Sequence, residues 1–386
     1  MSNPPLRILI TGKNGQLGWD LAQCYRALFQ ANPAIAGEVI ALDRATLDLT
    51  HPEQIRAKVR ELRPQLIINA AGYTHVDQAE QEPHLALQVN AVAPGILAEE
   101  ANRCGAALIH YSTDYVFAGD ACTPYREEEL TQPQNIYGQS KLLGEKAIAA
   151  IAQRYAIIRC SWLYSNRRHN FLHTILRLAR ERDTLRIVDD QQGSPTWVRT
   201  VTDVTQRMAP LTPGGIALTV PNGIYHVAAR GVTSWHGFAK AIIDHTTDPE
   251  RRAHQVEAIS SADYAAAARL TTAKRPAYSV LSHDKVEQTL GITLDDWQTQ
   301  LQACLAERAA IGAERPTPVI SAGNEAIQLF VPTFRIDECL GAIRECLEKG
   351  WTGLGYKTLA FEEAWKTYTG LPYAHFLNSA TAGLHL

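Results

Sequence analysis

Residues 6–18 are LRILITGKNGQLG, in which a short apolar run precedes three glycines, Gly12, Gly15 and Gly18. A helical pattern of apolar residues follows from Trp19. Glycines at this spacing allow a sharp turn, let a diphosphate approach bare backbone, and let the helix N-terminus present its amides. A glycine triplet alone also occurs in ordinary turns. The order of strand, glycine loop and helix nevertheless predicts a nucleotide-binding loop, and it does not match the order of a P-loop.

Four further apolar runs follow at helix-length intervals. They are Glu38–Leu42, Leu66–Ala70, Ala107–Ser112 and Ala156–Arg159. The segments between them have helical patterns. Near-continuously apolar strands separated by helices indicate a parallel sheet covered on both faces, because parallel neighbours need crossover connections. The sequence therefore predicts an α/β fold with a doubly wound parallel sheet, built mainly from residues 1–160.

The rest of the chain divides into three parts. Beyond Trp162 the periodicity weakens, and turn-rich stretches predict a smaller substrate-binding lobe over residues 161–308, with some elements returning to the sheet. Residues 309–321 combine two prolines with small and charged residues, which is typical of a linker. Residues 322–386 contain one amphipathic helical pattern and then stop, so we expect a truncated C-terminal appendage.

The composition of the 386 residues is ordinary for a globular protein, with 46% hydrophobic and 20% charged residues. Lysine and arginine number 37 against 40 acidic residues, and no run of like charge favours nucleic acid or a membrane surface. No apolar run approaches the roughly 20 residues of a membrane span, and no signal-peptide pattern is present. The seven cysteines include no Cys-x-x-Cys pair, which argues against disulfides and thiolate zinc sites. We expect a cytoplasmic protein.

A second cofactor signal lies at the end of the second predicted strand. Asp43 stands where a carboxylate can bind both hydroxyls of an adenosine ribose, which favours NADH. Arg44 beside it can pair with a 2′-phosphate, which allows NADPH. An aspartate after a strand can also be only a turn or helix cap. NADH or NADPH is therefore the expected cofactor.

A candidate catalytic group follows the fourth predicted strand. That strand runs into Thr113, while Tyr137 and Lys141 lie four residues apart on one face of a predicted helix. Carbonyl reduction needs an acid that protonates the oxygen as hydride reaches the carbon. We expect Tyr137 to be this acid, Lys141 to lower its pKa, and Thr113 to orient the carbonyl oxygen. The alternative is a surface tyrosine and a strand-end cap.

Several motifs together give the chain a family resemblance. Residues 12–18, Asn69-Ala70-Ala71-Gly72, residues 112–117 (STDYVF) and residues 137–141 (YGQSK) resemble the extended short-chain dehydrogenases/reductases. Within that superfamily, residues 6–305 are most similar to reductases of dTDP-4-dehydrorhamnose. The resemblance implies a Rossmann-type fold and reduction of this dTDP-sugar, dTDP-4-dehydro-6-deoxy-L-mannose, at C4 with NADH or NADPH.

The patterns and the resemblance together assign residues to roles. Thr113, Tyr137 and Lys141 would be catalytic, and Thr113, Asp114 and Trp162 would meet the substrate, although Trp162 can equally be a core residue. The predicted cofactor-binding residues are Gly12, Gly15, Gln16, Leu17, Gly18, Asp43, Arg44, Asp48, Leu49, Ala71, Gly72, Tyr73, Thr74, Tyr111, Tyr137 and Lys141.

Other interpretations stay open at this point. A sister reductase that makes another 6-deoxyhexose from a dTDP-4-keto sugar fits the same motifs, and so does a non-catalytic regulatory subunit that binds nucleotide. Some members of the family form homodimers through a magnesium site, and Asp20 stands where a glutamate is expected. We therefore predict no metal ligands, and we leave magnesium and a homodimer open.

The C-terminal segment carries a resemblance of its own. Residues 350–355 (GWTGLG) and 378–386 (NSATAGLHL) resemble the N-terminal part of sugar-nucleotide aminotransferases that use pyridoxal phosphate. The resemblance ends before the stretch that supplies the Schiff-base lysine, without which this cofactor cannot work. We expect no functional pyridoxal phosphate site in this chain.

Overall fold

The computed structural model describes residues 5–212, 215–246, 251–268 and 273–314, all within one compact unit. Its centre is a sheet of β1 (Leu6–Thr11), β2 (Gly37–Leu42), β3 (Leu66–Asn69), β4 (Ala107–Thr113), β5 (Tyr155–Cys160) and β12 (Gly223–Val227). The strand order is β2-β1-β3-β4-β5-β12, and all neighbours are parallel. The predicted fold class is confirmed, and the five predicted strands are present. The sixth strand, β12, returns to the sheet from the part of the chain assigned mainly to the lobe.

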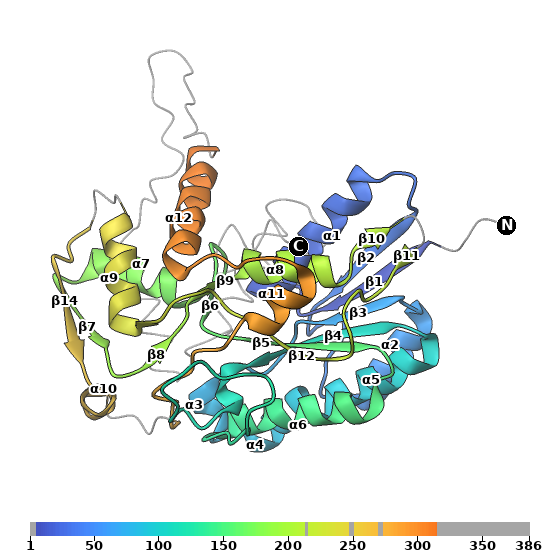
Figure 1. Ribbon diagram of the computed structural model, residues 1–386, viewed down its shortest axis with the longest axis horizontal. Helices are drawn as coiled ribbons and strands as arrows, with labels where there is room; N and C mark the ends of the chain where they lie inside the picture. Colours follow the sequence, from blue (N-terminus) through green and yellow to red (C-terminus); the bar gives the residue numbers. More distant parts are fainter. Residues whose placement is uncertain (1–4, 213–214, 247–250, 269–272, 315–386) are drawn as a thin grey trace, which may run out of the picture. The chain divides into compact units, whose positions relative to one another are not determined.

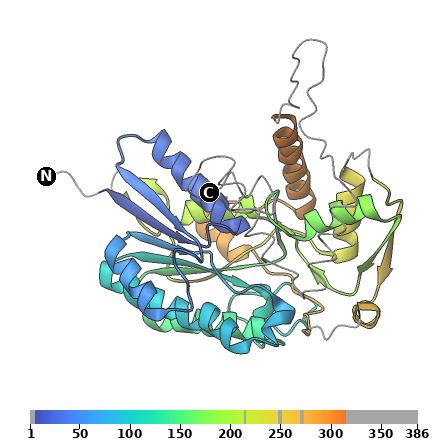
Figure 2. The same cartoon turned by 180° about the vertical axis from the view of Figure 1, so that it is seen from behind.

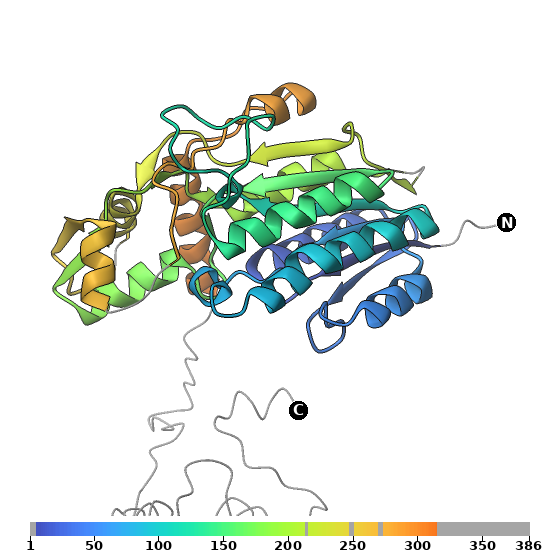
Figure 3. The same ribbon diagram turned by 90° about the horizontal axis from the view of Figure 1, so that it is seen from below.

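Helices cover both faces of this sheet, as Figures 1 and 3 show. One face carries α1 (Gln16–Ala31) and α8 (Val198–Met208), and the other carries α2 (Pro52–Leu62), α5 (Ala93–Cys104) and α6 (Ile136–Ile151). Alternate strand residues supply the two cores: Ile8 and Ile10 belong to the first, and Leu9 belongs to the second. Burial on both faces explains why the strands are almost continuously apolar.

Short elements follow the carboxyl ends of β3 and β4. After β3 come α3 (Val76–Ala79), α4 (Pro83–Leu87) and a π-helical turn (Gln88–Val92) that leads into α5. A 3-10 turn (Asp114–Val116) follows β4 directly. The chain leaves β1 toward β2 and returns on the other side of β1 as β3. In doubly wound sheets, ligands bind at the carboxyl ends of the strands where the direction of winding changes.

The smaller lobe lies beyond the carboxyl ends of the sheet strands (Figures 1 and 2). Its main elements are α7 (Phe171–Glu181), β7 (Thr184–Val188), α9 (Trp235–His245), β14 (Gln255–Ile259) and α10 (Ser261–Ala268). Short strand pairs here are β6 (Leu163–Tyr164) with β9 (Thr196–Trp197) and β8 (Gln192–Gly193) with β13 (Thr233–Ser234). A third pair, β10 (Leu211–Thr212) with β11 (Gly215–Ile216), lies outside the lobe, beside β1 and β2 (Figure 1). A separate apolar cluster that includes Leu172, Phe238 and Leu301 forms the core of the lobe.

The described chain ends with α11 (Asp284–Leu290) and α12 (Trp297–Glu314). Helix α12 extends through residues 309–314, so the first part of the predicted linker is helical. The rest of that linker and the appendage 322–386 lie outside the described residues, and the boundaries at residues 160 and 308 stay predictions. None of the described helices is long and apolar enough to cross a membrane.

Candidate active site

The glycine loop between β1 and α1 lies against the loop that follows β3. Gly12 has a φ of 75°, and a Cβ there would lie 2.8 Å from the Ala70 carbonyl oxygen and the Ala71 amide nitrogen. A Cβ on Gly18 would lie 2.2 Å from the Gly12 carbonyl oxygen. Gly15 is the N-cap of α1 and provides no side-chain cap, so the first helical amides can bind an anion. The residues present therefore fit the diphosphate of a dinucleotide.

Asp43 follows β2 and lies beside the glycine loop. Its carboxylate pairs with Lys13 Nζ at 3.1 Å and accepts hydrogen bonds from Asn14 and Thr46. The hydrogen bond from Lys13 is the main reason that the pKa of Asp43 falls to about 2. Asp43 is therefore ionised at neutral pH, as binding of ribose hydroxyls requires.

Arg44 and Asp48 form an exposed pair at the same edge. Arg44 Nε lies 3.3 Å from Asp48 Oδ2, and the Arg44 side chain is 76% exposed. Asp48 also accepts hydrogen bonds from the amide and hydroxyl of Thr50. The next residue, Leu49, is buried in the core on the α2 face. The structure thus places both the carboxylate that favours NADH and the guanidinium that allows NADPH at the end of β2.

The loop after β3 is tied to β1 and approaches α6. Thr11 Oγ1 donates to Asn69 Oδ1 at 2.7 Å and accepts from the Ala71 amide at 3.2 Å. A Cβ on Gly72 would lie 3.4 Å from Lys141 Nζ. Ala71 and Gly72 therefore lie between the glycine loop and the predicted catalytic lysine.

Asn90 holds this loop from the other side and was not predicted from the sequence. It lies on the π-helical turn, accepts from the Tyr73 amide at 2.8 Å, and donates to the Tyr73 carbonyl at 2.9 Å. It also donates to Ser140 Oγ on α6 at 3.0 Å. Thr74, the next loop residue, is exposed. No local pattern marks Asn90, because its partners lie 17 and 50 residues away.

Replacing Asn90 with alanine is expected to lower the free energy of unfolding by about 1–3 kcal/mol, because polar groups of Tyr73 and Ser140 lose a buried partner. Urea unfolding followed by circular dichroism measures the change. Asn32→Ala is the matched control, since Asn32 is exposed and donates only to the Leu28 carbonyl within its own helix. Equal stability of the two variants would contradict the role assigned to Asn90.

The first turn of α6 brings Tyr137 to the end of β4. Asn135 caps this helix by accepting from the Gly138 amide at 2.8 Å. A Cβ on Gly138 would lie 2.2 Å from the Tyr115 carbonyl oxygen, so only glycine allows α6 to approach the 3-10 turn this closely. Tyr137 packs edge-to-face on Tyr115, with ring centroids 5.6 Å apart. Sequence spacing could not reveal this approach.

The structure brings Thr113, Tyr137 and Lys141 together. The expectation that Lys141 lowers the pKa of Tyr137 is wrong for this structure: burial raises that pKa, and the interaction that acts against the rise is with Thr113. Lys141 Nζ donates to the Tyr111 carbonyl at 2.6 Å. Burial lowers the pKa of Lys141 to about 8. Tyr137 is thus a protonated phenol at neutral pH, and Lys141, one helical turn further along α6, is a buried amine that is charged below about pH 8.

Asp114 lies immediately behind Thr113. Thr113 Oγ1 donates to Asp114 Oδ1 at 3.0 Å, and Ser161 Oγ donates to the other oxygen at 3.4 Å. Burial raises the pKa of Asp114 to about 6, although hydrogen bonds, first among them that from Ser279, act against this rise. Ser161 and Ser279 come from distant segments, and the sequence patterns did not single them out.

Trp162 packs on another tryptophan of the lobe. Its ring stacks on Trp235 of α9 with a centroid separation of 3.5 Å and an interplanar angle of 3°. A Cβ on Gly193 would lie 2.4 Å from Trp162 Cε2. Trp162 adopts a φ of 47°, an unusual value for a residue with a side chain. The contact with Trp235 was not predicted, and the expected contact of Trp162 with substrate stays a prediction.

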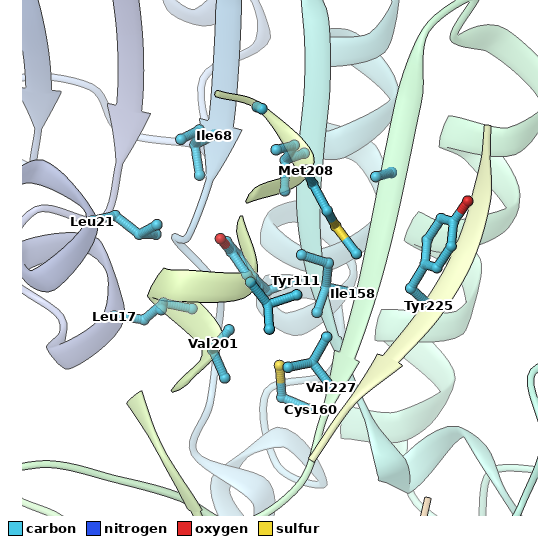
Figure 4. Packing of buried hydrophobic residues seen from close by; sticks show 14 of the residues in the cluster. Leu17, Leu21, Ile68, Tyr111, Ile158, Cys160, Val201, Met208, Tyr225 and Val227 are labelled. Carbon is cyan, nitrogen blue, oxygen red and sulfur yellow. The ribbon is translucent and has the colours of Figure 1, made fainter. Parts of the chain in front are cut away.

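Three of the residues assigned to the cofactor have side chains that serve the fold. Figure 4 shows Leu17 and Tyr111 within the apolar cluster between the sheet, α1 and α8. The Tyr111 hydroxyl lies 2.7 Å from Thr205 Oγ1 on α8, so its carbonyl is the group that reaches Lys141. The Gln16 side chain donates to the Leu163 carbonyl at 3.2 Å.

Asp20, considered above for magnesium, lies beside a guanidinium. Arg199 Nη2 lies 3.3 Å from Asp20 Oδ1 and 2.8 Å from Glu307 Oε1. Within the described ranges, no group of three or more His, Cys, Asp or Glu side chains is arranged to hold a metal ion.

Comparison with known proteins places this geometry in a family. Residues 6–310 match the family model for the RmlD substrate binding domain, and every residue assigned above to the site lies within the match. The chain belongs to the RmlD family. The dTDP-4-dehydrorhamnose reductase of Burkholderia thailandensis is 40% identical over 307 residues, covering 78% of this chain and 99% of the relative. That of Escherichia coli K12 is 38% identical over 310 residues, covering 78% and 98%.

Solved structures agree with the RmlD assignment. A dTDP-4-dehydrorhamnose reductase from Bacillus anthracis, crystallised in complex with NADP, has a TM-score of 0.69 and 34% identity, and the alignment covers 79% of this chain and all of that one. The Bordetella bronchiseptica enzyme WbmH in complex with NAD shares the fold, with a TM-score of 0.61 at 14% identity. The family resemblance drawn from the motifs is confirmed.

The second resemblance, at the C-terminal end, is also confirmed. Residues 335–386 match the DegT/DnrJ/EryC1/StrS aminotransferase family. These residues lie outside the described part of the chain. The expectation that they hold no functional pyridoxal phosphate site stays a prediction.

Proposed function

We propose that this chain reduces dTDP-4-dehydrorhamnose at C4 to dTDP-L-rhamnose with NADH or NADPH. The convergence of Thr113, Tyr137 and Lys141 beside a glycine loop carries the proposal. Support also comes from reductases named for this substrate, which match over nearly their whole length.

A bound reduced nicotinamide supplies the hydride that adds to the C4 carbon. Tyr137 donates the proton that the C4 oxygen needs, and its raised pKa keeps the phenol protonated at neutral pH beforehand. The ammonium of Lys141 stabilises the phenolate that remains, because opposite charges attract strongly in a buried site. A carbonyl oxygen placed between the two hydroxyls accepts the proton of Tyr137, and it accepts from Thr113 once that hydroxyl turns away from Asp114.

Asp114 has a positioning role through Thr113. Its carboxylate accepts from Thr113 Oγ1 and Ser161 Oγ. With a pKa of about 6 it is mostly ionised at pH 7, and it accepts the Thr113 proton until a substrate carbonyl replaces it as the acceptor. Direct contact of Asp114 and Trp162 with the substrate belongs to the same proposal.

The test is cofactor oxidation by the full chain. Purified protein is mixed with dTDP-4-dehydrorhamnose and with NADH or NADPH, the absorbance of the reduced nicotinamide is followed, and the product is identified by NMR. We expect loss of absorbance and formation of dTDP-L-rhamnose. The epimeric 6-deoxysugar as product would assign a sister reductase. No turnover by a folded protein that binds the cofactor would favour a non-catalytic, nucleotide-binding subunit.

The value of kcat/KM for the cofactor is expected to fall as the pH rises through about 8, because Lys141 of the free protein then loses the charge that stabilises the phenolate. Below that pH the amine is protonated and activity is retained. In Lys141→Arg the guanidinium stays charged, so the remaining activity should show no decline between pH 7 and 10. A pH–rate profile of both proteins is the measurement. The same decline in Lys141→Arg would assign it to another group.

The dTDP-sugar partner forms part of this proposal. The cytoplasmic location and the lack of nucleic-acid partners were expected from the sequence and stay predictions. The homodimer, which the sequence left open, stays open.

A further inference from the structure

A cavity of about 330 Å³ lies against the glycine loop. One wall consists of Lys13, Asn14 and Gly15 of the loop together with Trp19 of α1, and the other consists of residues 166–168. Residues 166–168 connect β6 to α7 and so belong to the lobe rather than to the nucleotide domain. The sequence patterns assigned no role to them.

Direct contacts hold the two walls together. The guanidinium of Arg167 lies over the Trp19 ring, 3.4 Å from its centroid. Arg168 Nε donates to the Asn14 carbonyl oxygen in the glycine loop. The loop that follows β1 is therefore closed from outside by two arginines that are more than 145 residues away in the sequence.

Arg168 has a backbone conformation that its side chain does not favour. Its φ is 62°, in the left-handed region that residues other than glycine, asparagine and aspartate seldom adopt. Asn170 donates to the carbonyls of Arg167 and Arg168 at 3.2 and 3.4 Å, which helps to hold this turn. Strained backbone that is held by its surroundings is typical of binding sites.

The charges around the cavity favour an anion. Lys13, Arg167 and Arg168 contribute three positive charges, and none of the described lining residues is acidic. The N-terminus of α1 adds the positive end of a helix dipole, which disfavours cations at this position. The positive charge of Lys13 is partly neutralised by its ion pair with Asp43. An anion in the cavity would be attracted by both walls and by the helix.

We propose that residues 166–168 form the outer wall of the cofactor's diphosphate site, and that Arg168 binds a diphosphate oxygen in place of the Asn14 carbonyl. The inference rests on the proposed function, since it takes the cofactor to be a nicotinamide dinucleotide. We assign the cavity to the diphosphate of the cofactor and not to its 2′-phosphate, because Gly15, the N-cap of α1, lines the cavity. Lys13 and Asn14 reach toward Asp43 on the ribose side.

The test is binding to the full chain, measured by the fluorescence of NADH and NADPH and by displacement with ADP-ribose. In Arg168→Gln, the Kd of all three ligands is expected to rise roughly 10-fold, and the ratio of the NADPH to the NADH value should stay constant, because one charge-assisted contact to the shared diphosphate is lost. Arg63→Gln is the matched control, since Arg63 is an exposed arginine with a φ of 45° at the end of α2.

Arg168→Gly separates binding from folding. Glycine accepts the left-handed conformation, so the melting temperature should be unchanged or higher while the affinity falls as in Arg168→Gln. Unchanged affinity for all three ligands would overturn the inference, and weakening of NADPH alone would overturn it in favour of a 2′-phosphate contact. A wild-type chain that binds neither cofactor would instead overturn the proposed function.

Discussion

Tyr137→Phe is expected to lower kcat about 10²- to 10⁴-fold, with little change in the Kd of the cofactor. The proposed acid is the Tyr137 phenol, which the first turn of α6 places beside Thr113, and phenylalanine retains the ring but removes the proton. Burial keeps the phenol protonated, and Lys141 stands one helical turn away to stabilise the phenolate. The Tyr137 ring is half-buried and packs edge-to-face on Tyr115 of the 3-10 turn, so the phenylalanine ring can keep the same position.

Steady-state kinetics and cofactor binding of the same preparation test this prediction. Tyr25→Phe is the matched control, because it also removes one buried phenol hydroxyl, which donates to the Ala209 carbonyl far from the site. That control should lose stability and retain kcat. If Tyr137→Phe keeps more than about one tenth of the wild-type kcat, another group supplies the proton.

Arg159→Met is expected to lower the free energy of unfolding by about 3–5 kcal/mol, the largest stability effect we predict. Arg159 on β5 forms a two-fold hydrogen-bonded ion pair with Glu145 on α6, with distances of 2.9 and 2.7 Å, and both side chains are only 2% exposed. Methionine fills similar space but leaves the Glu145 carboxylate unpaired in the interior. Removing one partner of a buried pair costs more than the pair itself contributes.

The double variant Arg159→Met/Glu145→Leu is expected to recover much of the loss, because neither charge then remains buried. Urea unfolding of the two single variants and the double variant gives the coupling between the residues. The exposed pair Arg177–Glu181 on α7 is the matched control, and breaking it should cost less than about 1 kcal/mol. A loss of similar size for both pairs would show that burial does not set the cost.

Local sequence patterns located five of the six strands of the sheet and the main residues of the candidate site. Apolar runs located β1 to β5, since most residues of these strands are apolar and pack into one of the two cores. The glycine loop, Asp43 and the Tyr137–Lys141 pair could also be predicted, because each depends on residues that are close together in the chain. Strand β12 was not located individually, as it pairs with β5 from nearly 70 residues further along.

Contacts between distant segments were decided by the tertiary structure alone. Asn90 reaches Tyr73 and Ser140 because a π-helical turn aims it at the loop after β3. Arg168 meets the glycine loop because the lobe lies at the carboxyl ends of the strands.

The physical reason is the range over which each signal acts. Periodicity and turn propensity depend on neighbours within a few residues, so they reveal strands, helices and loops with special backbone. The hydrogen-bond partners, burial and pKa of a side chain depend on which helices, strands and loops the sheet order brings together. The order β2-β1-β3-β4-β5-β12 places the loops after β1, β3 and β4 and the start of α6 at one edge. Motifs in the sequence thus pointed to carbonyl reduction with a nicotinamide cofactor. The residues that support the site, such as Asn90 and Arg168, were revealed only by the packing of distant segments.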